Sequence, residues 1–119
     1  MRYRWVNASK QDAVIATDAE RADTFGSRFK GLLGRDSLAE GGGLHIEPCN
    51  SIHMFFMKFA IDVLFLDEDL KVVRAISGIK PWRVTRVYPD AASVLELPVG
   101  VIARTGTVSG DQLTSQPVT

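Results

Sequence analysis

The stretch that most constrains the fold is CNSIHMFFMKFAIDVLFLD, residues 49–67, in which apolar residues are nearly continuous. Its β-branched and aromatic residues favour strands, and its polar residues lie mainly at the margins. We expect residues 51–57 and 61–66 to form strands in the middle of a β-sheet. The same run surrounds Asp62 with apolar neighbours, where a carboxylate must be paired, hydrogen-bonded or protonated.

Similar runs recur along the chain and predict a mainly β fold. YRWVNA and DAVIATDA near the start predict two short strands. LDEDLK predicts a hairpin turn, and SGDQL predicts a turn that leads into a last strand. Most of the remaining runs are bounded by turn-forming residues, and they predict strands at 44–47, 71–77, 82–88 and 93–97.

Helical spacing is clearest over residues 23–33. Apolar residues recur there at intervals typical of one helix face, Asp23 or Thr24 can cap the start, and Gly34 can end the helix in a left-handed conformation. A shorter helix is predicted after Pro98, with the proline in its first turn. We therefore expect a single β-rich α+β domain over residues 1–119, with a curled or barrel-like mixed sheet and two helices.

Composition and charge narrow the possible partners. The chain is 45% hydrophobic and 24% charged, and its formal net charge is +0, with no basic tail. We expect no nucleic-acid partner and no membrane partner. The start, MRYRWVNASK, has no apolar region after its basic residues, so we expect no secretory signal and a cytoplasmic location. The single cysteine, Cys49, excludes an internal disulfide and a zinc site built from several cysteines.

One local excess of charge lies between Lys71 and Tyr88, where five basic residues occur with no acid and with Trp82 among them. An anion-binding surface is one interpretation. If WRVTRVY is a strand, however, Arg83 and Arg86 point to opposite faces, which favours an ordinary solvated face.

Cys49, His53 and Met57 are soft or borderline metal ligands at four-residue spacing. In an extended strand, residues four apart lie about 13 Å from one another, so two of them cannot share one ion. We therefore expect no metal site and no cofactor. Met54 and Met57 are better explained as core residues that pack against aromatic rings.

Two carboxylates, Asp62 and Glu96, stand in apolar strands. They can form an acid/base pair of the hydrolase type, with His53 assisting, or each can bind Arg35, Lys58 or backbone amides. A structural role is favoured, because nothing in the sequence makes the two carboxylates neighbours.

Three segments resemble, in order and spacing, the blocks of the DUF192 family, also called UPF0127: FKGLLGRDSL, IHMFFMKFAIDVLFLD and VLELPVGVIARTGTVSGDQL. The resemblance runs from about Phe25 to Leu113, and the chain departs from many members at Phe56 and Ala60. It implies a small β-rich domain, found in bacteria and archaea, without an established biochemical function. The residues carried over are Gly31, Leu32, Arg35, Met57, Lys58, Asp62, Glu96, Gly100, Gly110 and Asp111.

The leading functional hypothesis is a non-catalytic binding module for a small polar ligand. Its candidate pocket comprises Arg35, His53, Lys58, Asp62 and Glu96. The alternatives are a hydrolase that uses the two carboxylates and His53, and a protein-interaction domain that uses exposed strand edges.

Overall fold

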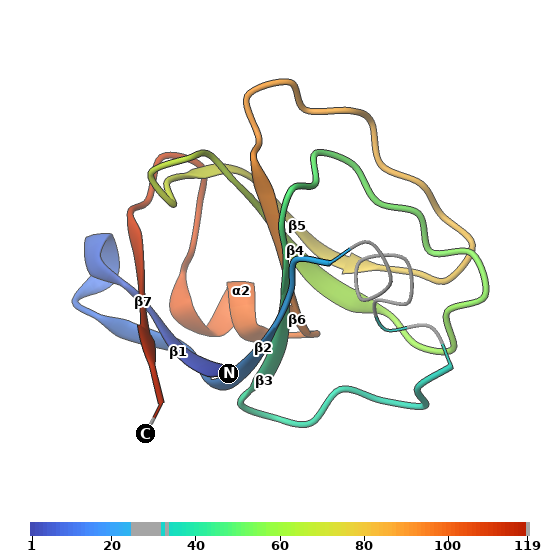
Figure 1. Ribbon diagram of the computed structural model, residues 1–119, viewed down its shortest axis with the longest axis horizontal. Coiled ribbons are helices and arrows are strands. Elements are labelled where there is room, and N and C mark those ends of the chain that lie inside the picture. Colours follow the sequence, from blue (N-terminus) through green and yellow to red (C-terminus); the bar gives the residue numbers. More distant parts are fainter. Residues whose placement is uncertain (25–31, 33, 119) are drawn as a thin grey trace.

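The computed structural model describes residues 1–24, 32 and 34–118, and it is mainly β (Figure 1). Within these residues, seven strands form one sheet, accompanied by one short α-helix and one 3-10 helix. The elements in chain order are β1 Arg2–Asn7, η1 Ala8–Lys10, β2 Ala13–Ala22, β3 Gly42–Ile46, β4 Ile61–Leu66, β5 Val72–Ile79, β6 Ser93–Pro98, α2 Val101–Thr105 and β7 Leu113–Pro117.

The sheet is curled into a half-barrel with strand order β5-β4-β6-β3-β2-β1-β7. β2 and β3 are parallel, and the other neighbouring strands are antiparallel. The two edge strands approach each other at one end, where Lys71 and Gln112 form an isolated bridge. There the Val72 amide donates to the Asp111 carbonyl, and the Leu113 amide donates to the Leu70 carbonyl.

Side-chain alternation divides the apolar residues into two cores. The inner core lies within the curl and includes Leu64 and Leu66 of β4, Leu95 and Leu97 of β6, and Val101 and Ile102 of α2. The outer core lies on the opposite face and includes Ile61, Val63 and Phe65 of β4 and Val94 of β6. Every residue of β4 is buried, because its two faces contribute to different cores. This explains the unbroken apolar run that the sequence shows there.

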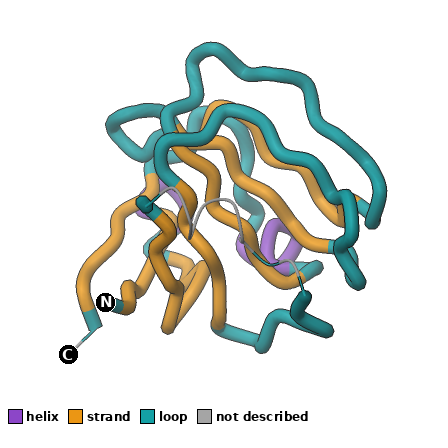
Figure 2. The backbone as a smooth tube through the Cα atoms, turned by 45° about the vertical axis from the view of Figure 1, so that its right-hand side comes forward, coloured by secondary structure: helices purple, strands orange, loops and turns teal. Residues whose placement is uncertain are grey.

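Two long loops lie on the outer side of the sheet, residues 47–60 and 80–92. They run side by side in both ribbon and tube views (Figures 1 and 2). Four of the residues in or next to them, Cys49, Ile52, Phe59 and Tyr88, pack against the outer core.

Most of the strands expected from the sequence are confirmed. The fold class is correct, and strands occupy the expected runs near 44–47, 61–66, 71–77 and 93–97, as well as both ends of the chain. α2 follows Pro98 as predicted, but Pro98 is the last residue of β6 and Gly100 is the N-cap, so the proline does not stand in the first turn. The helix expected over 23–33 falls largely outside the described residues.

Two predicted strands are wrong. Residues 51–57 and 82–88 are irregular segments joined by one isolated bridge between His53 and Val84. Phe56 has a φ of 65° and Trp82 a φ of 69°, a left-handed conformation that interrupts an extended strand. Aromatic and β-branched content therefore predicted strands here, but it did not reveal these two turns, whose rings are exposed.

Candidate functional site

Asp62 lies on the inner face of β4, where its side chain is enclosed by backbone donors. Its Oδ1 accepts from the Gly78 amide at 2.8 Å, and its Oδ2 accepts from the amides of Gly100 at 3.1 Å and Ile102 at 3.0 Å. The residue is 1% exposed. Its donors are backbone amides rather than Lys58 or Arg35, so the carboxylate ties β4 to β5 and to the start of α2.

Glu96 lies on the other face of the sheet. In the register of β6 it stands opposite Leu44 of β3 and Val63 of β4, both in the outer core. The residue is 6% exposed, and burial raises the pKa of its carboxyl group to about 7. Because Asp62 shares its face with the inner core, the structure does not bring the two carboxylates together. An acid/base pair formed by them needs a geometry that this sheet does not have.

His53 and Lys58 lie on the 47–60 loop, and both side chains are exposed. The Nδ1 atom of His53 accepts from the Phe55 amide at 3.3 Å. Lys58 Nζ donates to Asp36 Oδ1 at 3.2 Å, and the Asp36 side chain is 89% exposed. Both residues were expected to line one pocket together with Arg35, Asp62 and Glu96. Their side chains instead contact the Phe55 amide and Asp36.

Arg35 lines a polar pocket of its own. Its Nη2 donates to Glu20 Oε2 at 2.9 Å, while Arg2 Nη1 lies 3.1 Å from Glu20 Oε1. Arg2 also donates to Asp18 through Nε at 2.8 Å and Nη2 at 3.0 Å, and these bonds hold the pKa of Asp18 below its ordinary value. The guanidinium groups of Arg2 and Arg35 thus both bind Glu20, which lies near the C-terminal end of β2.

The pocket has a volume of about 480 Å³ and is built from the start of β1, from β2 and from the segment that leads into β3. Its lining residues are Arg2, Thr17, Asp18, Glu20, Arg35, Ser37, Leu38, Ala39, Glu40, Gly41, Gly42 and Gly43. Gly41 has a φ of 82°, and a Cβ there would lie 2.6 Å from Thr17 Oγ1. Its carbonyl accepts from the amides of Thr17 and Asp18, so this loop is held close against β2.

A polar cluster around Asp111 was carried over by the family resemblance but not placed among the candidate site residues. Asp111 accepts from Asn7 Nδ2, from Lys10 Nζ and from the Val108 amide at 3.0 Å each. Burial pushes its pKa upward, but these hydrogen bonds outweigh that effect and hold the pKa below its ordinary value. The cluster connects β1, η1 and the segment before β7, which is a structural role.

His45 is a further titratable residue that the sequence did not single out. Its ring lies 4.9 Å from the Trp5 ring, edge to face, and neither His45 Nε2 nor Trp5 Nε1 has a hydrogen-bond partner among the described residues. Burial, and then the charge of Arg21, lower the pKa of His45 to about 4. The sequence around His45 does not indicate this burial. It follows from the position of His45 in β3, where the side chain faces the inner core.

Across the described ranges, no group of three His, Cys, Asp or Glu residues is arranged to hold a metal ion. Met54 and Met57 are buried in the outer core. Over the same ranges, no helix has the length and apolar character needed to cross a membrane.

The family model of DUF192, described as "Uncharacterized ACR", matches residues 6–115. The chain belongs to DUF192. Its relatives include a UPF0127 protein of Thermococcus sibiricus, 38% identical over 97 residues, which are 77% of this chain and 62% of the relative. A UPF0127 protein of Pyrococcus furiosus is 34% identical over 102 residues, 83% of this chain and 87% of the relative. This DUF192 chain thus spans about three fifths of the length of the Thermococcus relative, and both relatives are archaeal.

Two solved structures resemble this DUF192 domain. A Sinorhizobium meliloti 1021 protein described as a candidate transcription regulator has a TM-score of 0.81 and 23% identity, covering 96% of this chain and 92% of that chain. A protein of unknown function from Novosphingobium aromaticivorans DSM 12444 has a TM-score of 0.80 and 22% identity, covering 96% of this chain and 84% of that chain. At these identities the likeness extends to the fold.

Proposed function

We propose that this DUF192 protein is a binding module that takes a small polar ligand with an anionic group in the Arg35 pocket. The observation that carries the proposal is the convergence of Arg2 and Arg35 on Glu20 at the pocket wall. Arg35 uses only Nη2 in this ion pair, and its side chain is 39% exposed. Its other N–H groups have no partner among the described residues, so they can bind a carboxylate or phosphate, which a guanidinium holds with two hydrogen bonds.

The size and composition of the pocket support a small ligand. A volume of about 480 Å³ is within the usual range for small-molecule sites. Glu40 and Ser37 also line it, and they complement an ammonium or hydroxyl group on the same ligand. A small hydroxy acid or amino acid combines both kinds of group. Of the five residues predicted for the pocket, the proposed site retains Arg35. It does not include His53, Lys58, Asp62 or Glu96, and its other lining residues are spatial neighbours of Arg35.

An NMR titration of the ¹⁵N-labelled protein tests this assignment. The probes are glutamate, citrate and inorganic phosphate, and the expected result is a saturable shift of the amides of Thr17, Asp18 and residues 41–43. Arg35→Gln should lower the affinity for the tightest-binding probe at least about tenfold, since it removes a hydrogen bond from a charged group. Arg74→Gln on β5 makes the same charge change away from the pocket and should bind like the wild type. Equal weakening by the two variants, or no saturable shift with any probe, would refute the proposal.

A further inference from the structure

A second surface, distant in sequence from the Arg35 pocket, lies on the 80–92 loop and has an unpaired backbone edge. On its inner side, the Thr85 amide donates to the Ile52 carbonyl at 2.9 Å, and the Met54 amide donates to the Arg83 carbonyl at 2.7 Å. In an extended segment, successive residues direct their N–H and C=O groups to opposite sides. Val84 therefore presents its backbone groups on the outer side, and they form no hydrogen bond within the described ranges.

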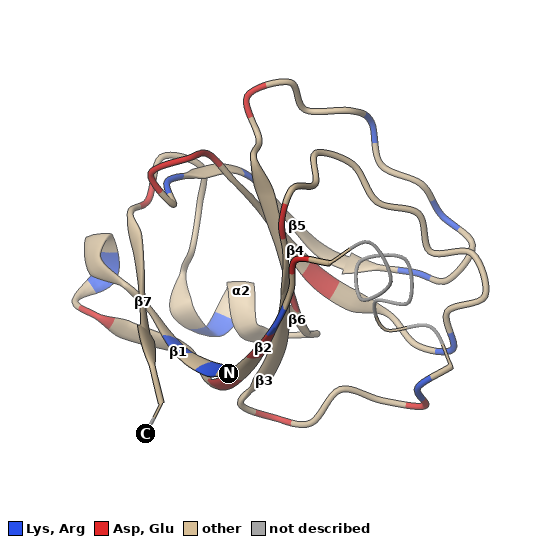
Figure 3. Cartoon of the chain, viewed as in Figure 1, with Lys and Arg blue, Asp and Glu red and all other residues tan. Residues whose placement is uncertain are grey.

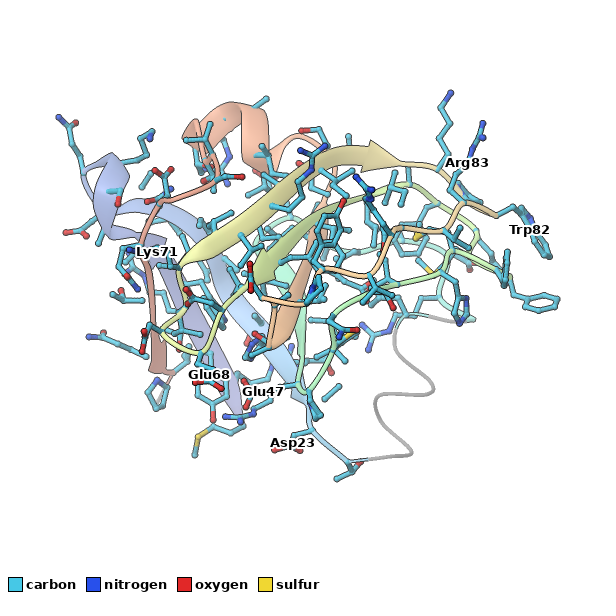
Figure 4. The ribbon with its side chains drawn as sticks, turned by 90° about the horizontal axis from the view of Figure 1, so that it is seen from above. Asp23, Glu47, Glu68, Lys71, Trp82 and Arg83 are labelled. Atoms are coloured by element: carbon cyan, nitrogen blue, oxygen red, sulfur yellow. The ribbon has the colours of Figure 1, made fainter. Side chains whose placement is uncertain are left out.

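Large apolar side chains stand exposed beside this edge. Phe56 is 70% exposed and Trp82 is 59% exposed, with ring centroids 4.9 Å apart. Both residues hold the left-handed backbone conformation described above, which is unfavourable for a bulky residue. The Trp82 amide donates to the Met54 carbonyl at 2.8 Å, and this bond helps to hold the turn in place. Figure 4 shows Trp82 and Arg83 at the extremity of the molecule, directed away from the sheet.

The loop also carries unpaired positive charge. Lys80, Arg83 and Arg86 are exposed, and none of them has an ion pair with another described residue. No acidic residue occurs between Leu70 and Pro89. Figure 3 shows these basic positions spaced along the loop. A surface with this charge favours an acidic partner.

We propose that the outer edge of residues 82–86 docks an extended acidic peptide segment of a partner protein. The peptide adds as a strand beside Val84, its carboxylates face Arg83 and Arg86, and an apolar side chain packs on Trp82 and Phe56. An open backbone edge matches another extended backbone, whose N–H and C=O groups complete the pairing. The two rings meet at an interplanar angle of 61°, so they form an apolar anchor rather than a parallel platform for stacked bases.

The first experiment pans the intact protein against a displayed library of random ten-residue peptides. We expect the selected peptides to be rich in Asp and Glu and to include an apolar residue that packs on Trp82 and Phe56. For the tightest of them, Trp82→Ala should weaken binding at least tenfold, and Arg86→Gln should weaken it several-fold. Arg74→Gln again serves as the charge control and should leave the affinity unchanged. A selection without acidic enrichment, or peptides that bind the Trp82→Ala protein as well as the wild type, would overturn the proposal.

Val84→Pro tests the backbone pairing itself, because proline removes the N–H group that the peptide would use. Val84→Thr keeps that N–H and the branched side chain. The proline variant should lose at least tenfold in affinity while the threonine variant binds like the wild type, with unchanged circular dichroism for both. Equal binding by the two variants would exclude strand addition. Binding of anionic phospholipid vesicles or of a dT20 oligonucleotide that depends on Trp82 would assign the surface to a membrane or to nucleic acid and would also overturn the proposal.

Discussion

Asp62 and Glu96 lie on adjacent strands, and both are buried, yet they have opposite surroundings. Asp62 faces the inner core and accepts hydrogen bonds from three backbone amides. Glu96 faces the outer core between Leu44 and Val63, where burial raises the pKa of its carboxyl group to about 7. Glu96 pairs in register with Val63, the residue next to Asp62, so the two carboxylates point to opposite faces of the sheet. One of them holds elements of the fold together, and the other lies where burial disfavours its charge.

The comparison shows that burial alone does not reveal the role of an acidic residue. A carboxylate that receives several N–H groups has a partner for each oxygen, whereas one placed among apolar side chains gains its proton more easily. The three donors of Asp62 come from β5 and α2, which are distant in sequence, so the carboxylate joins three elements. Glu96 joins none of the described elements in this way.

The largest expected effect follows from removing the Asp62 acceptor altogether. Asp62→Ala leaves the amides of Gly78, Gly100 and Ile102 without this acceptor; the Ile102 bond is buried and the other two are part-buried. An unsatisfied buried donor costs about 1–3 kcal/mol. We expect urea unfolding to show a loss of about 3 kcal/mol or more. Asp36→Ala is the control, because its exposed pair with Lys58 should contribute no more than about 1 kcal/mol. Similar losses in the two variants would show that the buried carboxylate has no special structural role.

Glu96→Gln should raise the free energy of unfolding instead of lowering it, and the size of the gain should depend strongly on pH. The pKa of Glu96 is raised from 4.5 to about 7 in the folded protein, so the folded state holds a proton that the unfolded chain releases within that window. The free energy of unfolding of the wild type therefore falls as the pH rises from about 4.5 to 7. The Gln variant should gain up to about 3 kcal/mol over the wild type between pH 4 and pH 8. A difference between the two proteins that is the same at both pH values would contradict the assigned environment.

His45→Gln tests the inner face of the sheet and should show the reverse dependence of stability on pH. Burial, followed by the charge of Arg21, lowers the pKa of His45 from 6.5 to about 4. The wild type should lose stability as the pH falls through that window, because the unfolded chain binds the proton first. The Gln variant should recover about 3 kcal/mol relative to the wild type between pH 7 and pH 4.

The smallest expected effect concerns metal removal. If neither carboxylate holds an ion, thermal unfolding should be unchanged within about 0.5 kcal/mol after dialysis against a chelator. The measurement is repeated with Asp62→Asn and Glu96→Gln, so that a metal-dependent change can be traced to one of the two sites. A large loss of stability on chelation would show that one carboxylate is a metal ligand.

The sequence predicted the parts of the fold in which local pattern and tertiary burial agree. Residues 61–66 and 93–97 are apolar on both strand faces, and both are central strands. The need of Asp62 for donors also followed from its apolar neighbours. The strands predicted at 51–57 and 82–88 were wrong because left-handed turns occur there at aromatic residues. Amino-acid composition gives no signal for such turns.

The Arg35 pocket could be predicted only in part. Arg35 itself was named, but its neighbours come from β1 and β2, and their approach depends on strand register. No local pattern links Arg2, Glu20 and Arg35, which are far apart along the chain. The burial of His45 was equally hidden, because it arises from a ring contact with Trp5, which lies two strands away in the sheet.

Amide hydrogen exchange in the wild type and in Asp62→Asn tests the structural role of Asp62 most directly. Asparagine keeps the shape but offers one oxygen acceptor, so at least one of the amides of Gly78, Gly100 and Ile102 must lose its bond. We predict slow exchange of all three in the wild type. In the variant, at least one should exchange faster than the accompanying global loss of about 1–3 kcal/mol explains. Unchanged protection at all three amides, with unchanged stability, would contradict the account.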